Sequence, residues 1–290
     1  MLIKDEFGEE YEVVPDVMTL EEIKGAVPFL AKHPKLAEKI MHKLQLDRVN
    51  EVHGACSTTP GPEFVRRLVY EQFNLTLKID NEEVLEKFKE GPFITISNHP
   101  MGAMDGIVLI YVISSFRPRY KVMVNMILNK LSGMRPNFIA VDALASDDPA
   151  KRQVSINGIR RVLQQLKSGE PVGFFPAGAV SKLNWKLRKE DRQWQESVIQ
   201  IIKKAKVPVI PIYFHDGNSW IFNALGLISW KLRTLRLPRE VFNKMGKTIH
   251  LSIGEPISAE EQALHSSSIK ELGNFLRKRT YDLKKQYKNS

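Results

Sequence analysis

The sequence predicts an α/β fold in which helices flank a mostly parallel sheet, with a helical cap at the N-terminus. From about residue 90, short apolar runs alternate with amphipathic helical segments, which is typical of strands joined by helices. The first 74 residues show helical spacing instead. The 290-residue chain is 43% hydrophobic and 26% charged, as globular proteins are. We therefore expect an N-terminal helical region over residues 1–74 and an α/β domain over residues 75–290.

The N-terminal region contains three segments with apolar residues at helical spacing. Leu20–Leu30 and Leu36–Leu46 are separated by Pro34, which favours a break between two helices. The turn cluster Ser57–Pro62 then precedes a third helical segment, Glu63–Phe73. No catalytic residue is expected in this region.

The α/β domain is expected to contain six strands. They are Phe93–Ser97, Tyr120–Val124, Phe138–Val141, Val172–Phe175, Val207–Phe214 and Ile249–Ile253. Helices are predicted over Val154–Leu166, Trp194–Ala205 and Ile269–Tyr287, the last of them basic, whereas Ile107–Ile113 fits a buried helix or a buried strand. Two prolines in Val207–Phe214 favour an edge strand or an irregular buried one, whose side chains form either core or the wall of a hydrocarbon slot.

Composition excludes several classes of protein. The single cysteine, Cys56, permits no internal disulfide and no cysteine-rich zinc site. The longest apolar run, Ile107–Ile113, is far shorter than the ~20 residues that a membrane-spanning helix needs. The N-terminus shows no secretion signal, so we expect a cytoplasmic protein. Neither a phosphate-binding P-loop nor a dinucleotide-binding glycine motif is present, and no cofactor or metal is expected.

The formal net charge of +10 is concentrated in the last third of the chain. Residues 182–290 hold 21 basic and 10 acidic side chains, a net +11, whereas residues 1–74 have a net charge of −4. Such a field attracts nucleic acid, anionic lipid or an acidic protein, although a basic surface without any partner fits equally well. Because no nucleic-acid recognition module is found, nucleic acid is not expected as a partner.

The first chemically informative stretch is Ser97–Gly106, which follows a predicted strand directly. His99 is expected at the strand end, where the working residues of parallel sheets lie. A neutral histidine accepts a proton from a hydroxyl or an amine, and a carboxylate at its other nitrogen fixes the tautomer. Asp105 is close enough in sequence to play this part. No nucleophilic residue accompanies the pair, so a direct attack by the acceptor is predicted, although a hydrogen-bonded turn histidine is the plain alternative.

The second stretch is Gly173–Lys182, a strand followed by Pro176-Ala177-Gly178 and Ser181. Backbone N–H groups from Gly178 to Ser181 at a strand end are suited to binding an oxyanion or an acceptor, and Lys182 adds a positive charge. An ordinary tight turn is the alternative.

Three motifs follow one another in the chain: Asn98-His99 with Asp105, Phe175-Pro176-Ala177-Gly178, and Val207-Pro208-Val209-Ile210-Pro211. In this order they resemble the lysophospholipid (glycerolipid) acyltransferase superfamily over roughly residues 90–260. The resemblance implies acyl transfer from a thioester of acyl carrier protein, or of coenzyme A, with His99 as base and Asp105 orienting it. Substrate contacts are expected from Asn98, Gly102, Phe175, Pro176, Gly178, Ser181 and Lys182.

Departures from the family pattern bear on the acceptor. The stretch from Asn98 to Gly106, with five residues between His99 and Asp105, is similar to the hemolysin-like branch that includes amino-acid N-acyltransferases. Val180 and Ala143 stand where phosphate-using relatives have arginine. The resemblance thus implies the amine of glycine or ornithine as acceptor in aminolipid synthesis, and Ala179 in place of an acidic residue favours glycine. Lysophosphatidic acid is the alternative acceptor.

A last segment, Trp220–Trp230, places two tryptophans around an apolar stretch and is followed by Lys231, Arg233 and Arg236. Tryptophan prefers the membrane interface and cations suit anionic headgroups, which predicts peripheral binding to the inner face of the membrane. A buried helix that closes the acyl slot is the alternative. A basic membrane-surface protein without enzymatic activity is the rival to the acyltransferase hypothesis.

Overall fold

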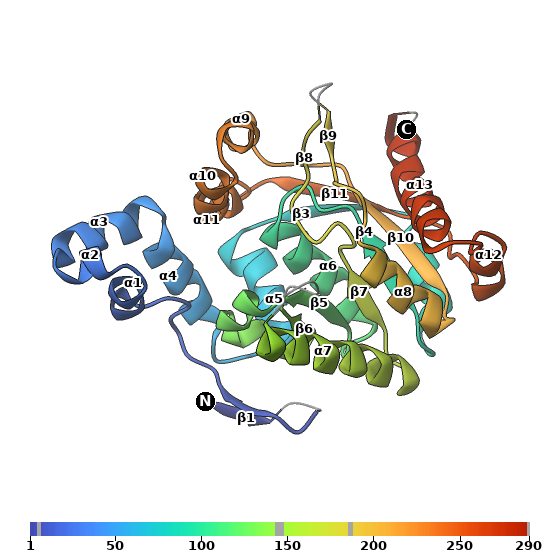
Figure 1. Cartoon of the computed structure of the whole chain (residues 1–290), viewed down its shortest axis with the longest axis horizontal. Helices are drawn as coiled ribbons and strands as arrows, with labels where there is room; N and C mark the ends of the chain where they lie inside the picture. The colour runs from blue at the N-terminus through green and yellow to red at the C-terminus, as the bar shows by residue number, and fades with distance from the viewer. Residues whose placement is uncertain (5–6, 143–147, 185–187, 289–290) are drawn as a thin grey trace.

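The computed structural model describes residues 1–4, 7–142, 148–184 and 188–288, so Ala143 lies outside the described residues. In this part of the chain, a seven-stranded sheet has helices on both faces (Figure 1). The strands are β1 Leu2–Lys4, β2 Glu10–Glu12, β3 Thr76–Asp80, β4 Ile94–Ser97, β5 Lys121–Asn125, β6 Phe138–Val141, β7 Val172–Phe174, β8 Lys182–Leu183, β9 Lys189–Glu190, β10 Val209–Phe214 and β11 Thr248–Ile253.

The α-helices are α1 Leu20–Ala26, α2 Pro28–Ala31, α3 Pro34–Lys43, α4 Leu46–Cys56, α5 Pro62–Arg67, α6 Ala103–Phe116, α7 Pro149–Lys167, α8 Glu196–Ala205, α9 Trp220–Ile228, α10 Trp230–Leu235, α11 Leu237–Phe242, α12 Ala259–Leu264 and α13 Ile269–Lys288. A π-helical turn, η1 Leu68–Gln72, and the 3₁₀ segments η2 Glu82–Phe88, η3 Met126–Lys130 and η4 Ser132–Asn137 complete the elements.

The sheet is mostly parallel, as predicted. Its strand order is β3-β11-β10-β4-β7-β5-β6, and only the β10–β11 pair is antiparallel among its described ladders. The carboxyl ends of β4, β7 and β10 therefore lie side by side at one edge of the sheet. Both chemically informative stretches begin at that edge, directly after β4 and β7.

Strand β10 shows that one alternative from the sequence is wrong. It lies inside the sheet between β11 and β4, fully buried, rather than at an edge. Its ladder with β11 begins only at Ile212, so Pro211, which has no N–H, interrupts no regular pairing there. Ile210, Ile212 and Phe214 pack in the core and do not line the cavity described below.

Local sequence explains where the predicted helices end or divide. The segment predicted as one helix over Leu20–Leu30 forms α1 and α2, because Pro28 cannot continue the hydrogen-bonding pattern. Strand β3 and helix α4 were not predicted. The apolar run Ile107–Ile113 is helical and belongs to α6, whose Val108, Leu109 and Ile110 are completely buried.

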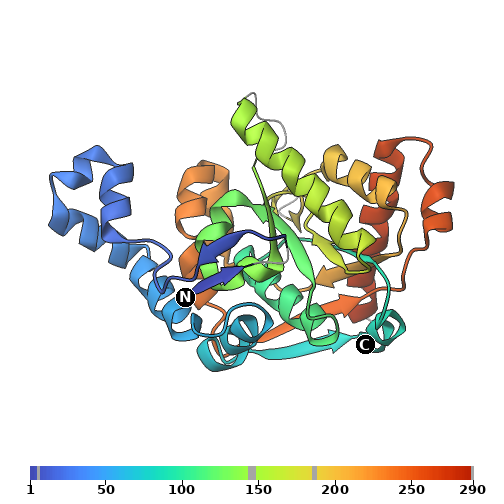
Figure 2. The same cartoon turned by 90° about the horizontal axis from the view of Figure 1, so that it is seen from below.

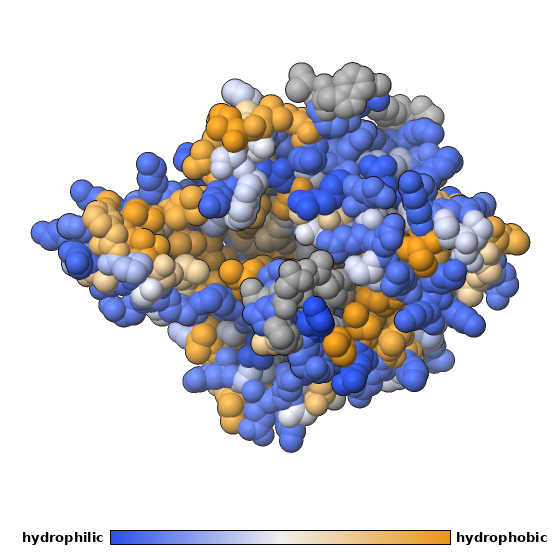
Figure 3. Space-filling view, viewed as in Figure 1, coloured by the Kyte–Doolittle hydropathy of each residue, from blue (hydrophilic) through white to orange (hydrophobic). Residues whose placement is uncertain are grey.

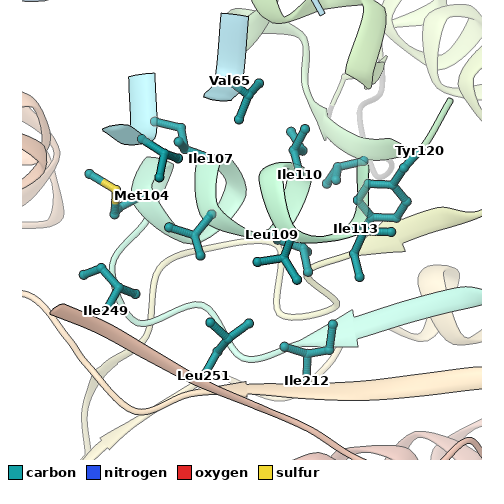
Figure 4. Close-up of a cluster of buried hydrophobic side chains, with 14 of the residues drawn as sticks. Val65, Met104, Ile107, Leu109, Ile110, Ile113, Tyr120, Ile212, Ile249 and Leu251 are labelled. Atoms are coloured by element: carbon teal, nitrogen blue, oxygen red, sulfur yellow. The ribbon is translucent and has the colours of Figure 1, made fainter. Parts of the chain in front are cut away.

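Two hydrophobic cores cover the two faces of the sheet. Helix α6 packs one face with α5 and η1. Its Leu109 and Ile113 side chains point toward the sheet, whereas Ile107 and Ile110 lie on the side of Val65 of α5 (Figure 4). The other face is covered by α7, α8 and α13, whose apolar residues form the second cluster. Burying each large aliphatic side chain contributes roughly 1.5–3 kcal/mol. The segments that carry His99 and Asp105 are therefore supported by a sheet that is well packed on both faces.

The helical cap projects from one end of the molecule (Figures 1 and 2). Helices α1 to α3 share a small core of their own, around Ile23, Leu30 and Ala37. His53 of α4 ties this region to the domain, because its Nδ1 donates to Pro15 O at 2.9 Å and its Nε2 accepts from Gly133 N at 3.2 Å. Phe64 of α5 already belongs to the main core, and a domain division at residue 74 stays a prediction.

Candidate active site

The predicted pair forms between a strand end and the helix that follows it. His99 lies just beyond β4, and its Nδ1 is 3.1 Å from Oδ2 of Asp105 in the first turn of α6. The His99 side chain is 18% exposed and that of Asp105 is fully buried. His99 also lies against the ring of Phe175, with the two centroids 4.3 Å apart. The imidazole is therefore held on two sides and faces the cavity with the rest of its ring.

Backbone groups fix the Asp105 carboxylate. Its Oδ2 accepts hydrogen bonds from Met101 N at 2.8 Å and Gly102 N at 3.0 Å. Burial raises the pKa of Asp105 above its ordinary value, while His99 and these two N–H groups oppose that rise. The carboxylate stays in place without help from solvent, which suits a group that orients a histidine.

Gly102 is required by the turn between His99 and α6. Its φ of +76° lies in the left-handed region, which favours glycine. A Cβ at this position would also approach Val180 Cγ2 at 3.2 Å and Leu237 Cδ2 at 3.3 Å. Gly102 lines the cavity beside His99, in agreement with the predicted site.

Asn98 has a positioning role in this geometry. Its amide donates to Phe214 O at 2.9 Å and accepts from Phe214 N at 2.7 Å. Both polar groups of the buried side chain are thereby bonded to the end of β10. Asn98 holds β4 and β10 in register at the site. Because both of its polar groups are already bonded, its side chain has little hydrogen-bonding capacity left for the substrate contact expected from the sequence.

The loop after β7 reaches the same place, as predicted. Phe175, Gly178 and Val180 line the cavity with His99. Gly178 has a φ of +62°, in the left-handed region that favours glycine, and a Cβ there would require the end of the Gln195 side chain to move, because its Nε2 would be 2.2 Å away. Pro176 is buried outside the cavity, where its carbonyl accepts from Gln195 N at 2.9 Å.

Two of the four N–H groups expected to bind an oxyanion are engaged elsewhere. Gly178 N donates to Phe175 O at 2.9 Å, and Ser181 N donates to His99 O at 2.8 Å. Those of Ala179 and Val180 make no hydrogen bond with any described residue. The oxyanion contact expected from the sequence is therefore left to the N–H groups of Ala179 and Val180, of which Val180 lines the cavity together with His99 and Gly102.

Asp191 links the turn after β4 to the loop after β7, and it was not predicted as a site residue. Its buried carboxylate accepts from Ser181 Oγ at 2.5 Å and from His99 N at 3.2 Å through Oδ1, and from Trp194 Nε1 at 3.2 Å through Oδ2. Ser181 is thus a partner of Asp191, away from the cavity. No sequence pattern marks Asp191, since two of its links to the site run to backbone or hydroxyl groups of residues distant in the chain.

Lys182 begins β8 with an exposed side chain, opposite Glu190 in the β8–β9 pair. It does not line the cavity, so the structure does not bring it into the group around His99. The site consists of the turn after β4, the first turn of α6, the loop after β7, and Asp191.

An apolar cavity of about 450 Å³ opens beside His99. Figure 3 shows the molecule hollowed between the helical cap and helices α9–α10. Inside, the walls come from α5, η1, α6, β5 and α11, and the lining is almost entirely hydrophobic: Phe64, Leu68, Ile107, Ile110, Val122, Val124, Phe138, Leu237 and Val241 are among its residues. A cavity of this size and character is suited to one flexible hydrocarbon chain.

A second titratable cluster lies near the end of β10. Asp80, His215 and His250 present ligand atoms within 4.8 Å of one another, a set that is able to hold a metal ion. These groups already bond to each other, since Asp80 Oδ2 is 2.7 Å from His250 Nε2 and accepts from Ser252 Oγ at 2.6 Å. Burial, and then the charge of His250, lower the pKa of His215 to about 4.

The segment Trp220–Trp230 forms α9 and the start of α10, and it does not close the cavity. Phe222 and Asn223 anchor α9 to the protein. Trp220 is 76% exposed and Trp230 is 71% exposed, so the alternative of a buried helix is wrong for both tryptophans. No described helix combines the length and the hydrophobicity needed to cross a bilayer.

The chain is similar to proteins of known activity. The family model described as acyltransferase matches residues 23–290. A lyso-glycine lipid O-acyltransferase of Bacteroides thetaiotaomicron is 28% identical over 232 residues, which are 76% of this chain and 78% of that protein. One of the same name from Phocaeicola vulgatus is 29% identical over 182 residues, 60% of this chain and 62% of that protein.

The fold also has a counterpart among solved structures. The 1-acyl-sn-glycerophosphate acyltransferase of Thermotoga maritima superimposes with a TM-score of 0.51, covering 90% of this chain and 93% of that one. The two sequences are only 16% identical, so this likeness concerns the fold alone.

Proposed function

Because the chain belongs to the acyltransferase family, we propose that it transfers a fatty acyl group from a thioester to a hydroxyl of a lyso-aminolipid, with lyso-glycine lipid as acceptor. The chain is an acyl-transferring enzyme with an acyl donor and a lipid substrate, which removes the non-enzymatic rival. The single observation that supports the proposal most directly is His99, backed by Asp105, at the mouth of an apolar cavity.

The chemistry of the acceptor follows from the relatives' name. An O-acyltransferase forms an ester, and glycine has no hydroxyl in its side chain. If glycine is joined to its lipid chain through nitrogen, the ester must form on a hydroxyl of that chain. The acceptor is then an N-(hydroxyacyl)glycine, whose amine is already acylated. The amine acceptor predicted from the sequence would belong to the preceding reaction, and it stays a prediction.

The reaction proceeds by direct attack in this proposal. His99 Nε2 accepts the proton of the acceptor hydroxyl while the oxygen attacks the thioester carbonyl. Asp105 stabilises the imidazolium that forms. In this proposal the N–H groups of Ala179 and Val180, which have no acceptor among the described residues, stabilise the oxyanion. As the tetrahedral intermediate collapses, the C–S bond breaks and the leaving thiolate takes the proton from His99.

The donor is proposed to be acyl carrier protein. Carrier proteins are acidic, and residues 182–290 have a net charge of +11. Electrostatic attraction of this kind speeds encounter and weakens with salt, because the screening length is only about 8 Å at physiological ionic strength. A rising KM for the carrier donor across a salt series is expected, with a smaller change for acyl-coenzyme A. An unchanged KM for the carrier donor would remove this argument.

We propose that the enzyme works at an anionic membrane surface. The exposed apolar side chains of α9 and α10 include Trp220, Ile221, Leu227, Ile228 and Trp230. Hydrophobic surface over α9 and α10 lies beside the hollow in Figure 3, and Lys231 Nζ is 5.9 Å from the centroid of the Trp230 ring. A lipid acceptor reaches the cavity from a bilayer without crossing water if this face rests on the membrane.

The deciding experiment offers the purified chain one acyl thioester and several acceptors side by side. They are N-(hydroxyacyl)glycine, free glycine, free ornithine and lysophosphatidic acid, with the lipid products measured by mass spectrometry. Ester formation on N-(hydroxyacyl)glycine is expected. Acylation of the free amino acids alone would favour the amine acceptor, and acylation of lysophosphatidic acid alone would overturn the aminolipid proposal.

A further inference from the structure

Arg233 of α10 is held against the loop that follows β7. Its Nη2 donates to Val180 O at 2.7 Å and to Ser181 O at 3.1 Å. The guanidinium lies over the ring of Phe222 of α9, with its central carbon 4.7 Å from the ring centroid. Gly226 leaves the room for it, because a Cβ there would lie 2.7 Å from Arg233 Cδ. The side chain is therefore fixed beside the active-site loop.

No carboxylate among the described residues pairs with this guanidinium. Its Nε–H and Nη1–H groups donate no hydrogen bond within the described part of the chain. The Asp191 carboxylate near the same loop is occupied by Ser181, His99 and Trp194. Arg233 thus keeps its Nε–H and Nη1–H donors, each able to give one charge-assisted hydrogen bond to an oxygen of a carboxylate or phosphate, while Nη2 is held by the two carbonyl groups.

A second cation lies nearby. Arg192 is exposed and has no bonded partner among the described residues. Burial, and then the charge of Arg192, lower the pKa of Arg233. No carboxylate among the described residues pairs with either guanidinium, so the positive charge of Arg233 would be neutralised by an anionic ligand.

The position is right for the headgroup of the acceptor. Val180, whose carbonyl Arg233 holds, lines the cavity together with His99, and Ser181 N donates to His99 O. Leu237, four residues after Arg233, lines the same cavity. An anion at Arg233 would thus lie at the rim, with the attached chain free to present its hydroxyl to His99.

We propose that Arg233, assisted by Arg192, binds the carboxylate of the acceptor headgroup. This inference rests on the proposed function, in which glycine is joined through nitrogen and offers only its carboxylate as a charged group. A phosphate monoester is also anionic, with a larger negative charge near pH 7, and would occupy the same position. The subsite therefore selects acceptors by charge, while the cavity receives the chain.

The test compares acceptors that differ only in charge. N-(hydroxyacyl)glycine and its glycinamide analogue carry the same hydroxyl, and lysophosphatidic acid and monoacylglycerol form a second pair. Arg233→Gln is expected to lower kcat/KM for the carboxylate acceptor by about 10- to 100-fold, the worth of a charge-assisted hydrogen-bonded pair, with little change for the amide. Arg233→Lys should restore part of the loss on the charged acceptor only.

Two further variants keep the test decisive. Arg239→Gln alters an exposed arginine of α11 and should change kcat/KM for neither the charged nor the neutral acceptor. Arg192 lies on the surface, so Arg192→Gln should fold normally even if Arg233→Gln does not. It should reduce kcat/KM for the charged acceptor and leave kcat/KM for the neutral acceptor unchanged. Equal losses on charged and neutral acceptors, or no loss with either variant, would overturn the subsite. If lysophosphatidic acid is acylated and N-(hydroxyacyl)glycine is not, the proposed function fails. A loss of kcat/KM for lysophosphatidic acid that exceeds the loss for monoacylglycerol would then still support an anion subsite at Arg233.

Discussion

The Nδ1 atom of His99 lies 3.1 Å from Oδ2 of Asp105, and the same oxygen accepts from the N–H groups of Met101 and Gly102. A single turn at the start of α6 therefore fixes both the carboxylate and the histidine that it faces. Because this turn follows β4 directly, the pair is as rigid as the sheet beneath it.

Removing the imidazole should abolish transfer without unfolding the protein. His99→Ala deletes the proposed base and should lower kcat by about 10²–10⁴-fold. The side chain borders the cavity and contributes little to the core, so the thermal unfolding midpoint should change only slightly. Steady-state acyl transfer and calorimetry measure the two effects. Turnover at the wild-type rate would exclude His99 as the base.

Asp105→Asn should separate activity from stability. Because burial raises the pKa of Asp105, the unfolded chain loses this proton at lower pH than the folded protein does. Wild-type stability then falls as pH rises from the ordinary aspartate pKa through the raised one, and stays lowered above it. Asn cannot ionise and avoids this penalty, while it leaves His99 without an anionic partner.

The measurement follows the unfolding midpoints of both proteins from below the ordinary aspartate pKa up to pH 8. The midpoint of Asp105→Asn relative to wild type should rise with pH and then level off, while acyl transfer falls steeply. A relative midpoint that declines with pH would show that His99 and the backbone N–H groups outweigh burial.

The parts of the fold that local patterns determine were predictable. All six predicted strands form, and His99, Asp105, Gly102, Phe175 and Gly178 meet at one sheet edge because parallel strands end together. The antiparallel pairing of β11 with β10 was not predicted, because the periodicity of apolar residues does not indicate the direction of a strand.

Long-range polar contacts explain what the sequence analysis missed. Asp191 reaches His99 across 92 residues of sequence, and Asn98 bonds the Phe214 backbone across 116. Neither spacing follows a secondary-structure period. The role of Asn98 differs from the expected substrate contact for the same reason, because its partner is a backbone group brought close only by the parallel pairing of β4 with β10.

Asp191 should act as a positioning residue. Asp191→Asn weakens the bonds to His99 N and Ser181 Oγ, and we expect kcat to fall about 10–100-fold with a small change in KM, the usual effect of losing an outer partner of a reactive group. Ser181→Ala removes one of these bonds and should cost less. The kcat and KM of each variant decide the point, and Trp194→Phe serves as the control that removes the third bond only. A loss confined to KM would contradict a positioning role.

Filling the cavity should shorten the acyl chain that the enzyme accepts. Val122 of β5 is buried and lines the cavity, so Val122→Phe should reduce kcat/KM for long-chain thioesters at least tenfold and spare short ones. Overpacking alone costs about 1–3 kcal/mol of stability. Val112→Phe provides the matched control, because Val112 is equally buried on α6 but does not line the cavity. Acyl thioesters of graded chain length measure the change in chain-length preference. An unchanged preference would show that the acyl chain does not bind in this cavity.

The exposed tryptophans should determine binding to anionic vesicles. Trp220 and Trp230 place large apolar surfaces in water, and burial in the bilayer interface would recover that surface, roughly 25 cal/mol for each Å². Replacing both with serine should abolish flotation with anionic liposomes and slow the acylation of vesicle-borne acceptor, while a detergent-dispersed acceptor should react normally. Leu264→Ser is the matched control, since Leu264 is 81% exposed on α12 in another part of the surface. If flotation survives the double replacement, α9 and α10 are not the membrane contact. If Leu264→Ser causes an equal loss of flotation, the effect comes from exposed hydrophobic surface in general and not from these two helices.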